Sequence, residues 1–195
     1  TYGQLYNLVK RTAKFLTDNG LKSGDRLSIL MHNTPEVLIF ELAGALIGSA
    51  TVPLDFKRDT LDRKIYKLQD TQTKALFVRL EDSQGSLELE LIRKKLPKLK
   101  VFSWVTFSQF LNLIPQGTTL QIIPRPPLDS TYLILFTSGT TAHPKGVILS
   151  TYACLLNAMG IIDWQNFDKE DRFNIILPLH HINSTEFCLS MLLIG

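Results

Sequence analysis

Residues 132–149 read YLILFTSGTTAHPKGVIL, two short apolar runs on either side of a polar loop. The first run extends from Tyr132 to Phe136 and the second from Val147 to Leu149. Apolar runs of this length are typical of strands buried in a sheet. Ser150 or Thr151 is a suitable cap for a helix that follows. The stretch therefore predicts strand, loop, strand and helix, which is the pattern of an α/β protein.

The loop from Thr137 to Lys145 has the composition of a phosphate-binding site. It holds four hydroxyl side chains, Gly139 and a lysine. Hydroxyl and backbone N–H groups donate to anionic oxygens, glycine lets the backbone approach closely, and lysine adds positive charge. A Walker loop is excluded because Gly146 follows the lysine, and a nucleophile elbow because no glycine lies two residues before Ser138. We interpret the loop as a cradle for nucleotide phosphates, with a Ser/Thr-rich surface hairpin as the alternative.

A helical pattern opens the chain, and residues 21–105 then alternate strand and helix patterns. Thr1 and Gln4 have capping-box spacing, and Gly20 is a fitting stop for the first helix. Thr34-Pro35-Glu36 has the residues that begin a helix. The predicted strands are Arg26–Met31, Ala50–Leu54, Ala75–Val78 and Lys100–Val105, and the later predicted helices are Pro35–Leu46, Leu61–Gln69 and Ser86–Leu96. This alternation predicts an α/β fold of layered, mostly parallel sheets with helices on their faces.

Pro124-Arg125-Pro126-Pro127 cannot continue a helix or a central strand. We therefore predict two α/β units, residues 1–123 and residues 124–195, of which the second carries the phosphate loop. The second unit is expected to contain a strand at Phe173–Leu177 and a last helix after Asn183. Because the final residues are apolar and lack a cap, we expect the chain to be a piece of a longer protein.

The loop resembles the signature of the adenylate-forming superfamily, which includes acyl-CoA and aryl-CoA synthetases and the adenylation domains of peptide synthetases. That signature, Thr-Ser-Gly-Thr-Thr-Gly-x-Pro-Lys-Gly, is similar to residues 137–146, with Ala142 in place of a glycine. A Cβ at that position restricts φ and predicts a stiffer loop. Residues 20–26, 44–55 and 177–181 also resemble segments of the family in the same order, so the resemblance covers almost the whole chain.

The resemblance implies the N-terminal part of an ATP-dependent acyl-activating enzyme. In such enzymes a carboxylate attacks the α-phosphate of ATP, pyrophosphate leaves, and a thiol then takes the acyl group from the adenylate. The residues that would contact the phosphates are Thr137, Ser138, Gly139, Thr140 and Thr141, with Lys145 adding charge. His181 would lie near the acyl pocket and the reacting carboxylate, so Lys145 and His181 are the candidate catalytic residues.

The resemblance also implies cofactors and partners. ATP would enter with Mg²⁺, and coenzyme A or a phosphopantetheine carrier would accept the acyl group. The acid would be a fatty or aryl carboxylic acid, which suggests fatty acid metabolism. The magnesium carboxylate and the C-terminal catalytic lysine of the family lie outside the 195 residues, so the piece alone is expected to be inactive. Two alternatives stay open: an adenylation domain that loads a carrier protein, and a non-catalytic nucleotide-binding relative in which Ala142 marks a decayed loop.

Composition limits the other possibilities. A formal net charge of +3 argues against a nucleic-acid partner. Cys154 and Cys188 form no Cys-x-x-Cys pair, which excludes a disulfide scaffold and favours a cytoplasmic protein. The longest apolar stretch, Val37–Val52, is too short and broken to span a bilayer. No metal site is expected, because the pair His180 and His181 with Cys188 lacks the spacing of zinc ligands.

Overall fold

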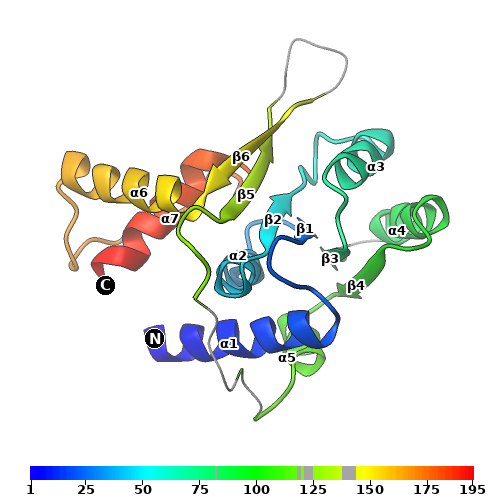
Figure 1. Cartoon of the computed structure of the whole chain (residues 1–195), viewed down its shortest axis with the longest axis horizontal. Coiled ribbons are helices and arrows are strands. Elements are labelled where there is room, and N and C mark those ends of the chain that lie inside the picture. Colours follow the sequence, from blue (N-terminus) through cyan, green and yellow to red (C-terminus); the bar gives the residue numbers. More distant parts are fainter. Residues whose placement is uncertain (82, 118–119, 121–124, 138–143) are drawn as a thin grey trace.

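The computed structural model describes residues 1–81, 83–117, 120, 125–137 and 144–195 (Figure 1). Its strands form one sheet in the order β4-β3-β1-β2-β5-β6. Their bounds are β1 Arg26–Leu30, β2 Ala50–Pro53, β3 Ala75–Arg79, β4 Lys100–Trp104, β5 Thr131–Phe136 and β6 Gly146–Ser150. The first five strands pair in parallel, and β6 runs antiparallel to β5. The predicted α/β class with a mostly parallel sheet is confirmed.

The helices are α1 Tyr2–Asp18, α2 Pro35–Ile47, α3 Leu61–Asp70, α4 Ser83–Lys95, α5 Phe107–Leu113, α6 Thr151–Gln165 and α7 Ile182–Ile194. The predicted capping box is present at α1, where Thr1 and Gln4 exchange hydrogen bonds. Helix α2 ends at Gly48, which has a φ of 75°. That left-handed conformation is available to glycine without strain, so the chain can reverse into β2.

Both faces of the sheet are covered by helices, which gives three layers. On one face, α1, α2 and α5 pack against side chains such as Leu27 and Phe77, and the ring centroids of Phe77 and Phe40 lie 4.4 Å apart. On the other face, α3 and α4 pack against Val52, Leu76 and Val78. Helices α6 and α7 cover β5 through a third apolar cluster. Successive side chains of a strand point to opposite faces of the sheet. Because these strands are apolar at successive positions, both faces must be covered for their side chains to be buried.

Helix α5 was not predicted from the sequence. Thr106 caps it, and the Gln109 side chain bonds back to the cap, so both halves of a capping box are present. The Thr-x-x-Gln spacing of residues 106–109 was therefore the feature of the sequence that could have predicted the start of this helix. The helix buries Phe110 beside Trp104, with ring centroids 5.4 Å apart.

The predicted strand at Phe173–Leu177 is wrong. This segment carries no strand pairing with the rest of the described chain. Instead, the side-chain amide of Asn33 donates to the carbonyl of Leu177 at 2.8 Å. Phe173, Ile176 and Leu177 are exposed. An apolar run forms a strand when a neighbouring strand provides hydrogen-bond partners for its backbone N–H and C=O groups. The composition of the run does not show whether such a neighbour exists.

The predicted boundary between the two α/β units falls at residue 124, which lies outside the described residues. Across it, β5 pairs with β2 through Leu133 and Thr51, so a single sheet includes strands from both predicted units. The division into 1–123 and 124–195 stays a prediction. Within the described ranges, no helix is both long and apolar enough to cross a membrane.

Candidate functional site

A cavity of about 490 Å³ lies at the edge of the sheet where the parallel strands end. Ligands of open α/β sheets bind at this carboxyl edge, because the loops there diverge and leave a crevice. Its wall includes Pro53 at the end of β2 and Phe136 at the end of β5. The other lining residues are Asp55, Arg58, Asp59, Arg63, Lys67, Leu135, Thr137, Pro144, Val147, Leu149, His180, His181 and Ile182.

The predicted phosphate loop begins and ends at this cavity. Thr137 and Pro144 both line it, and the backbone N–H of Thr137 donates to the carbonyl of Lys145 at 3.0 Å. Lys145 is exposed and is not among the lining residues. The other predicted phosphate contacts, Ser138, Gly139, Thr140 and Thr141, lie outside the described residues. The described ends of the loop therefore place its base at the cavity.

His181 faces the same cavity from the opposite segment of the chain. It is the exposed cap residue of α7, and its backbone N–H donates to the carbonyl of Pro178 at 3.1 Å. The turn is anchored because the N–H of Leu179 donates to Oδ1 of Asn33 at 2.8 Å. The structure thus brings together two predicted site residues, Thr137 and His181, that are remote in sequence.

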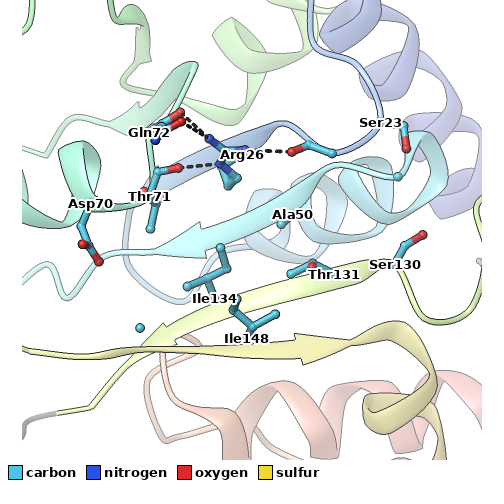
Figure 2. A pocket seen from close by; sticks show the side chains of 13 residues that line it. Ser23, Arg26, Ala50, Asp70, Thr71, Gln72, Ser130, Thr131, Ile134 and Ile148 are labelled. Atoms are coloured by element: carbon cyan, nitrogen blue, oxygen red, sulfur yellow. Dashed lines mark hydrogen bonds between the residues drawn. The ribbon is translucent and has the colours of Figure 1, made fainter.

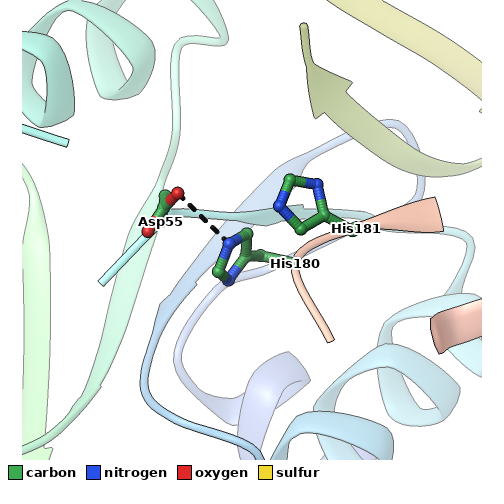
Figure 3. A group of neighbouring side chains, drawn as sticks. All are labelled: Asp55, His180 and His181. Carbon is green, nitrogen blue, oxygen red and sulfur yellow. Dashed lines mark ion pairs between the residues drawn. The ribbon is translucent and has the colours of Figure 1, made fainter. Parts of the chain in front are cut away.

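Sequence reasoning missed Asp55, which follows β2 and pairs with His180 (Figure 3). The Nε2 atom of His180 lies 3.2 Å from Oδ2 of Asp55, and both side chains are largely buried. Burial lowers the pKa of His180, against the opposing charge of Asp55. Burial acts to raise the pKa of Asp55, but the backbone N–H groups of Arg58 and Lys57 and the nearby positive charges outweigh it and lower that pKa. At neutral pH the contact is therefore a hydrogen bond from an imidazole N–H to a carboxylate.

A buried ion pair forms another part of the wall. Lys67 of α3 bonds Oδ2 of Asp59, and both side chains are less than a tenth exposed. The ammonium group of Lys67 also lies 5.3 Å from the ring centroid of Phe136. Asp59 therefore neutralises Lys67, whereas Arg58 and Arg63 line the cavity with exposed positive charge. Such a wall suits an anionic ligand.

A second cavity, of about 520 Å³, lies at the amino ends of β1 and β2 (Figure 2). Arg26 lines it, and its guanidinium donates to the backbone carbonyls of Gly24, Thr71 and Gln72. Because these bonds and one to the Gln72 side chain use most of the guanidinium donors, Arg26 ties the loop after α3 to the start of β1. We therefore assign Arg26 a structural role. The cavity at the carboxyl edge of the sheet remains the candidate functional site.

The chain is similar to known proteins over its whole length. A family described as "AMP-binding enzyme" matches residues 1–195. The indoleacetate–CoA ligase of Aromatoleum aromaticum is 29% identical over 193 residues, covering 93% of this chain and 36% of the ligase. The crotonobetaine/carnitine–CoA ligase of Salmonella paratyphi B is 31% identical over 196 residues, covering 94% of this chain and 37% of the ligase. The chain thus spans little more than a third of these relatives.

The fold has a match among solved structures. The o-succinylbenzoate CoA synthetase of Bacillus subtilis, in complex with its acyl-adenylate intermediate, superposes with a TM-score of 0.81 at 24% identity. The match covers 100% of this chain and 47% of the synthetase chain. At this identity the similarity establishes a shared fold.

Proposed function

The chain belongs to the AMP-binding enzyme family, and on this premise we propose that it is the N-terminal part of an ATP-dependent acyl-activating enzyme. The reaction joins a carboxylate to the α-phosphate of ATP, releases pyrophosphate, and passes the acyl group to a thiol. Both curated relatives are named as CoA ligases, which favours coenzyme A over a carrier protein as the acceptor.

One observation carries the proposal: the base of the phosphate loop and His181 line the same cavity. Acyl activation needs a triphosphate and a carboxylate held against each other, so the two groups of residues must share one space. Thr137 supplies the phosphate side of that space, and His181 supplies the acyl side. The exposed Arg58 and Arg63 add positive charge for two anionic substrates.

The roles of the loop follow from its chemistry. Thr137, Ser138, Gly139, Thr140 and Thr141 bind the β- and γ-phosphates through hydroxyl and backbone N–H donors. Lys145 adds positive charge where the leaving pyrophosphate accumulates negative charge. Mg²⁺ accompanies ATP and neutralises part of the phosphate charge when bound. We propose a fatty or aryl acid as substrate and the cytoplasm as location, with fatty acid metabolism as the setting.

ATP–pyrophosphate exchange tests this proposal, since exchange requires adenylate formation and no thiol. The intact enzyme is assayed with a panel of fatty and aryl acids, with acid omitted as the blank. Acid-dependent exchange supports the proposal. A second assay adds coenzyme A and follows the acyl thioester. Nucleotide binding without exchange for any acid would instead favour the non-catalytic alternative.

A further inference from the structure

Asp55, His180 and His181 form a compact group of metal-ligand side chains at the cavity (Figure 3). One potential ligand atom from each residue lies within 4.8 Å of the other two. The ring centroids of the two histidines are 4.5 Å apart. The carboxylate comes from the end of β2 and the histidines from the turn before α7, so only the fold brings the three together.

The spacing suits a shared ion. Zinc ligands lie about 2.1 Å from the metal, so two ligands of one ion are separated by at most about 4.2 Å. The 3.2 Å between Nε2 of His180 and Oδ2 of Asp55 already meets this condition. His181 is exposed, so a small rotation of its ring can bring the third ligand atom within reach. We propose that Asp55, His180 and His181 bind one divalent transition-metal ion.

The Asp55 carboxylate and the backbone of the turn that carries the histidines are held in place before any ion binds. Oδ1 of Asp55 accepts the backbone N–H groups of Lys57 and Arg58, each at 2.9 Å, and this leaves Oδ2 directed at His180. The turn that carries the histidines is fixed by the bond from His181 N–H to Pro178 and by the bond from Leu179 N–H to Asn33. Preorganised ligands lose little conformational freedom on binding.

The donor set selects the kind of ion. Two imidazoles and one carboxylate suit Zn²⁺, Co²⁺ or Ni²⁺, whereas Mg²⁺ takes oxygen ligands and retains waters. Asp59 neutralises the nearby Lys67, which reduces the repulsion that this lysine would exert on a cation. Arg58 and Arg63 also line the cavity, but both are exposed, so solvent screens the repulsion that they add. Three protein ligands would leave one position of a four-coordinate ion open, and water or an anionic oxygen of a ligand in the cavity would complete the coordination. The proposed ion shares His181 with the proposed acyl side of the cavity, but metal binding can be measured without any acid or ATP, so its test is independent of acyl activation.

The test is a Zn²⁺ titration of metal-free protein in competition with a chromophoric chelator. We expect about one tightly bound Zn²⁺ per chain. Asp55→Asn, His180→Gln and His181→Gln should each weaken binding at least about tenfold, because even the outer partners of metal ligands change affinity by 10–100-fold. The matched control is His32→Gln, since Nε2 of His32 also lies near a carboxylate, 3.0 Å from Oε2 of Glu81. This control should bind Zn²⁺ like the unaltered protein.

Circular dichroism shows which variants fold, and a folded variant among the three is sufficient for the comparison. The imidazole NMR resonances of the unaltered protein test the proposal without any variant. Zn²⁺ should shift the resonances of His180 and His181 and leave those of His32 unchanged. Absence of Zn²⁺ binding, binding that all folded variants retain, or a Co²⁺ spectrum with a thiolate charge-transfer band would each overturn the proposal.

Discussion

The phenolic oxygen of Tyr132 lies 3.4 Å from Oε2 of Glu41, in a part of the core where β5 meets α2. Both residues are buried, and Oε1 of Glu41 has no hydrogen-bond partner among the described residues. Burial raises the pKa of Glu41 to about 8, although the bond from Tyr132 opposes this. Glu41 is therefore protonated in the folded protein at neutral pH and ionised in the unfolded chain.

This relationship predicts a pH-dependent stability. Because the folded-state pKa is raised, the stabilisation is fully present below the ordinary pKa of 4.5 and is lost as pH rises toward about 8. In that window the free energy of unfolding should fall by up to roughly 1.4 kcal/mol for each pH unit. Glu41→Gln keeps an amide that can accept from Tyr132 and should flatten the dependence, as measured by urea unfolding from pH 5 to pH 8.

The matched control is Glu90→Gln, because Glu90 is exposed on α4. It should leave the slope unchanged. Burial also raises the pKa of Glu186, so some slope should remain in Glu41→Gln. An equal slope in Glu41→Gln and the unaltered protein would show that Glu41 ionises without cost in the folded state.

A second prediction contrasts two glycines. Gly48 has a φ of 75°, and a Cβ there would lie 2.6 Å from Oγ of Ser23. Gly160 lies inside α6, and a Cβ there would meet no described atom within 4 Å. Gly48→Ala should therefore destabilise the fold by roughly 1–3 kcal/mol. Gly160→Ala should stabilise it by about 0.5–1 kcal/mol, because alanine favours helix. Thermal unfolding of the two variants should shift in opposite directions, and shifts of the same sign would contradict the argument.

Local chemistry explains which parts of the fold were predictable. The capping box at Thr1 and the helix start at Pro35 act within a few residues, so the sequence reveals them directly. The Phe173–Leu177 segment has the composition of a strand, but strand formation depends on a partner that composition does not specify. Helix α5 is short and was missed, although its capping box was visible at Thr106.

Only part of the candidate site could be predicted from the sequence. The loop from Thr137 to Lys145 could be proposed because its donors and its lysine are contiguous in the sequence, and its role stays a prediction. The pair of Asp55 and His180 was not, since its two residues meet only after β2 and the turn before α7 are placed at one edge of the sheet. The sequence does show that Asp55 directly follows an apolar strand, which is a common place for a site residue. That position does not reveal that His180 is its partner.

A third prediction concerns the acyl side of the site. His181→Ala in the intact enzyme should raise the KM for the acid about tenfold, which corresponds to the loss of one contact worth about 1.4 kcal/mol. The KM for ATP should change little, because the phosphate loop is unaltered. Exchange kinetics at saturating ATP and at saturating acid separate the two effects. A rise in the KM for ATP alone would contradict this prediction and would indicate that His181 contacts the nucleotide and not the acid.

The last prediction concerns Lys145, whose carbonyl closes the base of the loop by accepting the N–H of Thr137. Alanine retains that backbone bond, so Lys145→Ala removes charge without opening the base. Charge accumulates on pyrophosphate in the transition state, so the loss should fall on kcat more than on the KM for the acid. One such contact is worth roughly 2.7–4 kcal/mol, or about 10²–10³ in rate.

The control for this prediction is Lys169→Ala, which removes an exposed lysine of the segment between α6 and α7 and not of the phosphate loop. It should exchange pyrophosphate at the unaltered rate. Lys145→Arg retains the charge but not the compact ammonium, and it should recover part of the loss. If Lys145→Ala exchanged as fast as Lys169→Ala, charge at the end of the loop would contribute nothing to adenylate formation, and the hydroxyl and backbone donors alone would have to hold the leaving pyrophosphate.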